Sequence, residues 1–323
     1  MTDTLSPLAA FDIASDGSTV ALTDLWPDAQ AAPGAAWRWL HLDLADPAAE
    51  PWADAHLPPV ATAALFQPET RPRCDIHSNG LLLNLRGINM NPGAERDDMV
   101  SLRLWVTEGL VVSVRRRKVF ALDDIRRAAA DGHGPRTTGA FLDLLTDGLI
   151  DRLEQVSLKL ETEADRLEEI IFENPNHSDR EALATTRRIA IRLRRYVWPQ
   201  REALGRLAAA DMPFLPPETR HLLAETANRA TRTVEELDAI SARMAALQDH
   251  IYAEHSARIG RNGYVLSVVA AIFLPLSLLT GLFGVNIAGM PGLHWPYAFA
   301  VLTLGIIVLG ILLYALFRWK HWF

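Results

Sequence analysis

Two long apolar runs without a charged residue stand out in the pattern of hydrophobic and polar positions. They cover residues 264–283 and 296–317, and at about 1.5 Å per residue each can cross a hydrocarbon core of about 30 Å. A buried helical hairpin of a soluble protein is the alternative, but uncharged runs of this length exceed what a globular core needs. We therefore predict two transmembrane helices over these runs, joined by a short external loop at 284–295.

Basic and aromatic residues flank both runs. Arg258 and Arg261 precede the first run, and Arg318 and Lys320 follow the second. Aromatic side chains of the type found at membrane interfaces mark the ends of the runs, namely Tyr264, Trp295, Tyr297, Trp319 and Trp322. The positive-inside rule places both termini in the cytoplasm. The four basic residues are expected to form a basic cytoplasmic collar that anchors to anionic headgroups.

A helical pattern leads into the first run. Pro216-Pro217-Glu218 favours a helix start, and no proline follows until Pro275. Apolar or small side chains recur in steps of four and three, as in a coiled coil: Leu223, Ala227, Ala230, Val234, Leu237, Ser241, Met244, Gln248 and Ile251. A single helix of roughly 65 residues cannot bury such a stripe alone, so we expect packed neighbours. Two spans are also too few to enclose a pore, so transport would require a ring of subunits.

Two further helices are predicted upstream. The first runs from Ala140 to about Glu173, and the second begins after a cap at Ser178 and runs to about Ala210. The first is acidic near its end and the second is basic. The acidic cluster could hold a metal and the basic one could bind nucleic acid. We favour an antiparallel helical hairpin whose opposite charges lie near one another on solvent-exposed faces. Aromatic residues do not alternate regularly with the arginines along the basic helix, so we expect no nucleic-acid partner.

The N-terminal part combines short strands with short helices. The predicted strands are the alternating segment 37–44, the apolar run 81–85, and a hairpin of 100–106 and 110–114 around Thr107-Glu108-Gly109; the predicted helices are 59–65 and 121–130. The predicted fold class is an α+β membrane protein with an α/β N-terminal domain. The predicted domains are a cytoplasmic α/β domain (1–135), a helical stalk (136–262) and a membrane domain (263–323).

Charge is divided unevenly between these parts. All 39 acidic and 28 of the 32 basic residues lie in 1–254, which gives that part a formal net charge of −11 and the remainder +4. The single cysteine, Cys74, excludes an intramolecular disulfide and a CxxC-type zinc site, and a plain buried thiol is the preferred interpretation. No P-loop, HExxH, nucleophile elbow or glycine-rich nucleotide fingerprint appears, so we do not expect an enzyme.

A family resemblance rests on the end of the first run. Gly284-Val285-Asn286 matches the Gly-X-Asn signature of the CorA-type metal-ion transporter superfamily, and the apolar stretch 273–283 and the basic-aromatic ending 318–323 agree with it. Within that superfamily the chain resembles the ZntB zinc-transport branch. Gly-Val-Asn in place of Gly-Met-Asn carries that resemblance, together with the segments 85–89, 98–105 and 287–292.

The resemblance implies a funnel-shaped homopentamer in the cell inner membrane. The first span of each subunit would line a central pore and the second would face lipid. The implied pore-lining residues are Leu266, Leu274, Ser277 and Gly281, with the signature Gly284, Val285 and Asn286 at the outer mouth. The helical spacing adds Gly263 and Ala270 to the predicted pore-lining residues. These pore positions recur every three or four residues and therefore share one helix face.

The predicted pore face contains no carboxylate, thiolate or imidazole. Zn²⁺ prefers cysteine, histidine and carboxylate ligands, so the ion is expected to pass largely hydrated, with Asn286 contacting its outer-shell waters and apolar rings at Leu266 and Leu274 gating by dewetting. A structural helix cap is the alternative role of Asn286. Gly292 stands where the magnesium branch carries a glutamate, which weakens a magnesium-channel assignment.

Four residues are candidate metal ligands outside the pore face. His250 and Glu254 are spaced i,i+4 and could share a metal, and His255 lies just beyond them; His294 is the titratable residue of the external loop. For each of them an ordinary surface or interfacial role is the alternative. No permanently bound cofactor is expected.

Three functions are compatible with these observations. The first is transport of divalent metal ions, with Zn²⁺ preferred and Cd²⁺, Ni²⁺ and Co²⁺ as further cargo; the resemblance also suggests coupling to protons. The second is a magnesium, cobalt and nickel channel of the CorA type, gated by cytoplasmic metal. The third is a membrane-anchored sensor or scaffold that moves nothing. The implied partners are therefore the lipid bilayer, divalent cations, protons and further copies of this chain.

Overall fold

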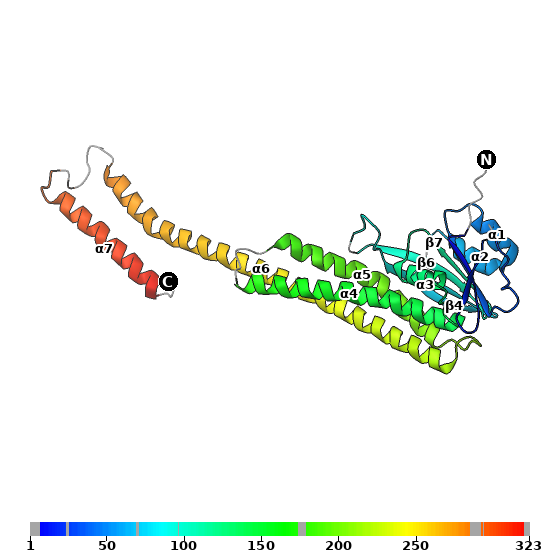
Figure 1. Cartoon of the computed structure of the whole chain (residues 1–323). Helices are drawn as coiled ribbons and strands as arrows, with labels where there is room; N and C mark the ends of the chain where they lie inside the picture. Colours follow the sequence, from blue (N-terminus) through cyan, green and yellow to red (C-terminus); the bar gives the residue numbers. More distant parts are fainter. Residues whose placement is uncertain are drawn as a thin grey trace. The chain divides into compact units, whose positions relative to one another are not determined.

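The computed structural model describes residues 7–23, 26–68, 71–95, 97–173, 179–284, 292 and 294–319. The chain forms two compact units, Met1–Gln248 and Asp249–Phe323. The first unit contains a sheet with short helices and a group of long helices (Figure 1). The second contains the C-terminal part of one long helix and a final helix. The three-part division predicted from the sequence stays a prediction.

A mixed seven-stranded sheet forms the core of the first unit. Its order is β2-β1-β3-β7-β6-β5-β4, with β1 (Ala9–Ile13), β2 (Thr19–Ala21), β3 (Trp37–Asp43), β4 (Arg73–His77), β5 (Gly80–Ile88), β6 (Met99–Val106) and β7 (Leu110–Arg115). The hairpin predicted around Thr107-Glu108-Gly109 is confirmed as β6 and β7. In the centre of the sheet β3 and β7 pair in parallel, whereas the other neighbours are antiparallel.

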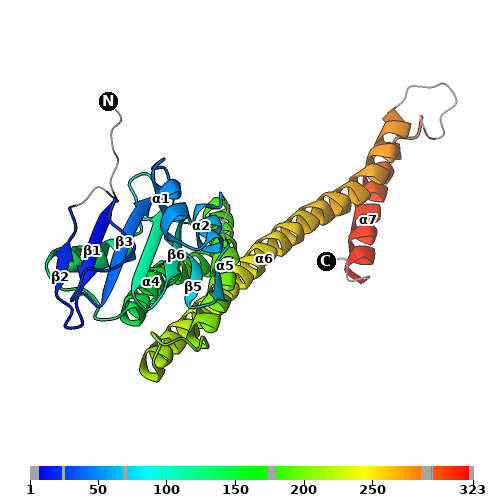
Figure 2. The same ribbon diagram turned by 90° about the vertical axis from the view of Figure 1, so that its right-hand side faces the viewer.

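Helices cover both faces of the sheet (Figure 2). On one face α1 (Ala49–His56) and α2 (Pro59–Phe66) bury Leu82, Trp105 and Val112. On the other face lie α3 (Phe120–Ala130) and the start of α4 (Thr138–Glu173). Phe141 of α4 packs edge-on against the two tryptophans of β3, with ring centroids 5.8 and 5.1 Å apart. Burial of these large aromatic surfaces stabilises the sheet against the helices.

A buried polar cluster lies beneath α4 on this second face. The Nε2 atom of His41 accepts a hydrogen bond from Arg115 Nε at 2.9 Å, and His41 Nδ1 lies 2.9 Å from Ser113 Oγ. Trp39 Nε1 donates to the same Ser113 hydroxyl at 2.8 Å. Burial, followed by the nearby Arg115 charge, lowers the pKa of His41 to about 3. The imidazole is therefore neutral, which allows it to accept from a guanidinium.

Three long helices pack together in the first unit: α4, α5 (Arg180–Ala208) and the N-terminal part of α6 (Pro217–Gly284). Most of the predicted stripe of α6 is buried, with Leu223, Ala230, Leu237 and Met244 fully enclosed. The neighbours that this stripe requires are thus helices of the same chain. One prediction about α5 is wrong: its N-cap is Asp179, whose side chain accepts from the Ala182 N–H, whereas Ser178 lies outside the described residues.

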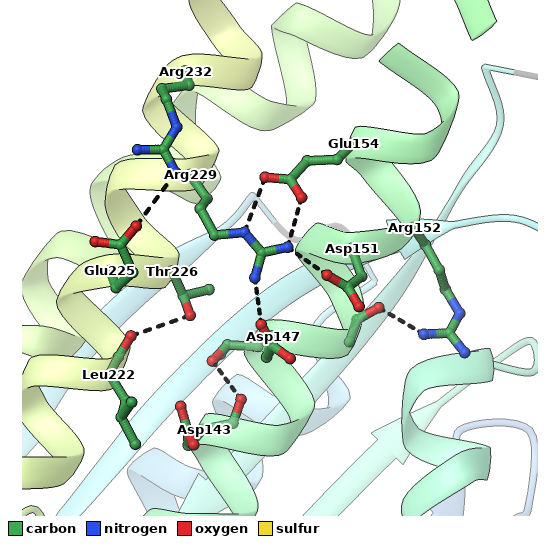
Figure 3. Close-up of polar contacts among 12 residues, drawn as sticks. Asp143, Asp147, Asp151, Arg152, Glu154, Leu222, Glu225, Thr226, Arg229 and Arg232 are labelled. Atoms are coloured by element: carbon green, nitrogen blue, oxygen red, sulfur yellow. Dashed lines mark hydrogen bonds and ion pairs between the residues drawn. The ribbon is translucent and has the colours of Figure 1, made fainter. Parts of the chain in front are cut away.

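Charged pairs join α6 to its two neighbours, and Figure 3 shows those between Arg229 of α6 and the carboxylates of α4. Arg229 of α6 reaches α4, where its Nε donates to Glu154 at 3.0 Å and its other nitrogens contact Asp147 and Asp151. Further pairs of this kind link Arg243 to Asp165 and Glu168 of α4, and Arg194 of α5 to Asp238 of α6. The acidic helix α4 and the basic helix α5 also pack against each other, as the predicted hairpin requires. At these positions their charges pair with α6, whereas Arg192 of α5 pairs with Asp97.

Candidate functional site

Both predicted spans belong to long apolar helices in the second unit. The first lies in the C-terminal part of α6, and the second is α7 (Ala298–Trp319). Each helix is long and apolar enough to cross a membrane, and the apolar segment of each is almost entirely exposed within the chain. A soluble core helix would be mostly buried, so this exposure is typical of helices whose side chains meet lipid or another copy of the chain.

One face of the α6 span packs within the unit. Val268 is only 5% exposed, and Leu276 Cδ1 lies 4.0 Å from the position that a β-carbon would take at Gly310 of α7. Ala271, Ile272, Pro275 and Leu279 are half-buried on the same side. The small Gly310 allows α7 to approach α6 closely, as small residues do at membrane helix interfaces.

The predicted pore face lies on the opposite side of α6. At about 100° per residue, its positions centre roughly opposite the packed face. Leu266 and Leu274 are 70% and 69% exposed. Gly263, Ser277 and Gly281 are also exposed, and Ala270 is half-buried. Within one chain, the predicted pore face is thus the side of this helix that α7 leaves uncovered.

The signature is only partly described. Gly284 is the last residue of α6, whereas Val285 and Asn286 lie outside the described residues, as does much of the predicted external loop. Gly292 has a φ of +88°, a left-handed conformation that glycine adopts readily. Its carbonyl accepts from the Trp295 N–H at 3.0 Å. His294 beside this turn is exposed.

The exposed face of α6 offers hydroxyl and backbone oxygens. Thr280 Oγ1 donates to the Leu276 and Ser277 carbonyls at 3.1 and 3.0 Å, so this hydroxyl is used within the helix. Pro275 has no N–H, which leaves the carbonyl of Ala271 without its usual helical donor, but both residues lie on the half-buried side of the helix. Such neutral oxygens can contact a hydrated cation, but they are poor substitutes for its inner shell.

The predicted metal ligands form at most a pair. His250 Nε2 lies 3.9 Å from Glu254 Oε1, and His255 is exposed on the same helix. Among the described residues no group of three or more metal-binding side chains comes together. Of the predicted collar, Arg258, Arg261 and Arg318 are exposed, and Lys320 lies outside the described residues.

Comparison with known proteins decides the family. The family model described as "CorA-like Mg2+ transporter protein" matches residues 34–319. The chain belongs to the CorA family. CorA-family relatives include the zinc transport protein ZntB of Pectobacterium atrosepticum, 36% identical over 84% of this chain and 83% of that protein. The divalent cation transporter CmaX of Pseudomonas aeruginosa is 34% identical over 94% of this chain and 90% of that one.

Solved structures agree with the CorA assignment. The full-length CmaX structure has a TM-score of 0.82 at 32% identity and covers 98% of both chains. The CorA magnesium transporter of Methanocaldococcus jannaschii has a TM-score of 0.78 at 15% identity, again over 98% of both chains, and shows the fold alone. The chain is therefore a divalent cation transporter of the CorA and ZntB type, with a soluble α/β domain, a long helix and C-terminal apolar helices.

Proposed function

We propose that this chain transports Zn²⁺ across the cell inner membrane through the central pore of a homopentamer. The observation that carries the proposal is the uncovered face of α6, where Leu266 and Leu274 are 70% and 69% exposed directly opposite the side that packs on α7. In a ring of copies with α6 inside and α7 outside, these faces enclose one axis. Both termini lie in the cytoplasm in this arrangement.

The chemistry of that face favours passage of a hydrated ion. Leucine rings at 266 and 274 form apolar constrictions that open and close by wetting. Ser277 supplies a hydroxyl oxygen between them and the outer mouth. Asn286 is assigned to the mouth, where its amide oxygens contact outer-shell waters of the ion. No step in this path requires Zn²⁺ to leave a tight protein site.

Two observations support zinc as the cargo. The ZntB proteins that resemble this chain are named for zinc transport. Gly292 also leaves its loop position without the fixed negative charge that concentrates cations at a pore mouth. We further propose that the flux responds to a proton gradient, as the zinc branch suggests, and that Cd²⁺, Ni²⁺ and Co²⁺ follow the same path.

The test is metal flux into proteoliposomes that contain a zinc-sensitive dye. The native protein is expected to move Zn²⁺, and faster with an imposed pH gradient than without one. Asn286→Ala should reduce the flux by at least about tenfold. Thr303→Ala is the matched control, because Thr303 lies in α7 and its hydroxyl donates to the Phe299 carbonyl at 2.8 Å. Equal flux through Asn286→Ala and the native protein would refute the role of the signature.

A magnesium, cobalt and nickel channel is the second candidate, favoured by the description of the matching family as Mg²⁺ transporters. Flux measurements in the same vesicles distinguish the zinc transporter from the magnesium channel. Zn²⁺ entry that ignores the proton gradient, together with faster Mg²⁺ entry, would favour the channel. Absence of flux for every cation tested would reject both transport functions.

A further inference from the structure

A large cavity opens in the α/β domain beside the C-terminal end of α2. Its volume is about 780 Å³, within the range of small-molecule sites, about 300–1,000 Å³. Its lining comes from the segment after α2, from β5 and β6, and from α5. Three of the lining residues are arginines: Arg71, Arg86 and Arg195. No carboxylate belongs to the described part of this lining.

A fourth arginine lies in the sheet next to the cavity. Arg103 is two residues along β6 from the lining residue Ser101 and so points to the same face. It is only 3% exposed. Its Nη2 donates to the Gln67 carbonyl at 2.9 Å, while Nε and Nη1 have no hydrogen-bond partner among the described residues. A buried guanidinium with two unused donors is costly unless an acceptor reaches it.

Aromatic rings stand between the arginines. The guanidinium carbons of Arg86 and Arg195 lie 4.6 and 5.1 Å from the centroid of the Tyr196 ring. Arg195 Nη2 also donates to the Tyr196 hydroxyl at 3.1 Å. Trp198, a further lining residue, is 42% exposed. The guanidinium carbon of Arg201 lies 5.4 Å from the centroid of the Trp198 ring, so a planar ligand would stack on the opposite face of this partly exposed ring.

Burial of the arginines, to which their mutual repulsion adds, favours an anionic ligand. Burial, with a further contribution from Arg195, lowers the pKa of Arg86; burial, followed by Arg86 and Arg116, lowers that of Arg103. Like charges brought together in a partly desolvated pocket raise its free energy, and a bound anion would relieve that cost. Arginine is also the side chain best suited to bind phosphate through two parallel hydrogen bonds.

We propose that this cavity binds a phosphate-bearing ligand of nucleotide size, with its phosphates on Arg71 and Arg195, beside the buried charge of Arg103, and its ring against Trp198. The volume exceeds what inorganic phosphate requires, and the combination of arginine and an exposed aromatic ring suits a nucleotide. The site belongs to the soluble α/β domain and is independent of the proposed ion path. It therefore adds a ligand to this transporter rather than a second route for metal.

Isothermal titration calorimetry on the full chain in detergent tests this proposal. ATP and AMP are the probes, in EDTA so that metal chelation by the nucleotide contributes no heat, and adenosine and inorganic phosphate are the comparison ligands. ATP and AMP are expected to bind saturably and more weakly at higher salt. Arg195→Gln should weaken ATP binding by about tenfold or more. Arg188→Gln, an exposed arginine of the same helix outside the cavity, should leave it unchanged.

Each other outcome overturns the proposal. Absence of saturable binding by any probe, or equal loss in both variants, would mean that the cavity is not the site. Inorganic phosphate binding as tightly as ATP would reject the nucleotide-sized ligand. A Trp198→Leu variant provides a second test: the affinity for ATP should fall about tenfold, while the affinity for inorganic phosphate should stay unchanged. Unchanged melting temperatures of the variants exclude misfolding as the cause.

Discussion

Leu276 of α6 lies against Gly310 of α7, with its Cδ1 atom 4.0 Å from the position that a β-carbon would occupy there. Leu274, two residues earlier, is 69% exposed. Two residues correspond to about 200° around a helix, so the two leucines point to nearly opposite sides. The pair thus separates the face of α6 that packs within its own chain from the face that its own chain leaves exposed.

Cysteine accessibility tests this separation of faces. Cys74 is buried, and burial raises the pKa of its thiol to about 12. The native protein should therefore not react with thiol reagents, which makes it a suitable background for new cysteines. Leu274→Cys is expected to react with a charged, membrane-impermeant thiol reagent and to lose Zn²⁺ flux on modification. Leu276→Cys should react at least about tenfold more slowly, since it packs on α7. Equal rates at both positions would mean that the exposed face does not line water.

Arg229 is predicted to be a stability residue. It faces Asp147, Asp151 and Glu154 of α4 (Figure 3), and Arg229→Ala leaves three carboxylates without this partner. Because the carboxylates are partly solvated, we expect a loss of only about 1–2 kcal/mol of unfolding free energy, or a few degrees in Tm.

Arg232→Ala is the matched control on the same helix. Arg232 pairs with Glu225 at 3.3 Å, and both side chains are 58% exposed. An exposed pair of this kind contributes little, about 0–1 kcal/mol. Thermal unfolding of both variants gives the comparison, and an equal effect of the two would contradict the assignment.

Asp143 is predicted to destabilise the fold when ionised. Partial burial, followed by the charge of Asp147, raises the pKa of Asp143. Its ionisation is therefore easier in the unfolded chain, and folding stability falls as pH rises from below its ordinary pKa of 3.8. Asp143→Asn should raise Tm at pH 7 and have little effect below that pKa. Asp147→Asn, which removes a contact of Arg229, should instead lower Tm at pH 7.

His41 should make the first unit sensitive to mild acid. Its pKa is lowered from 6.5 to about 3 by burial and by Arg115, so the unfolded chain binds a proton more readily than the folded one. The contribution of neutral His41 to the unfolding free energy is fully present above pH 6.5 and is lost as pH falls toward 3. Between pH 7 and pH 5 the expected loss is about 2 kcal/mol.

A His41→Asn variant checks the source of that acid sensitivity. It cannot titrate in this range, so its stability difference between pH 7 and pH 5 should shrink by about the same 2 kcal/mol. Unfolding of the first unit can be followed by tryptophan fluorescence, because Trp37, Trp39 and Trp105 are buried in its sheet. An unchanged pH dependence in the variant would assign the effect to other groups.

The sequence by itself determined the features that depend on local patterns. The two uncharged runs predicted the apolar C-terminal part of α6 and nearly all of α7. The four-and-three spacing predicted the stripe that α6 buries between residues 223 and 251. Alternation and turn residues predicted β6 and β7. These signals are local because helix and strand periods repeat within a few residues. The Gly-X-Asn signature in its context indicated the family.

Only the tertiary structure decided which distant residues meet. The parallel pairing of β3 with β7, the contact of Arg229 with α4 and the burial of His41 depend on segments about 70 or more residues apart. Periodicity does not encode such pairings, since many registers satisfy the same pattern. The arginine-lined cavity likewise joins α5 to β5 and β6. From sequence, Arg195 belonged to a solvated basic helix and nothing linked it to Arg71 or Arg86; packing brings the three around one space.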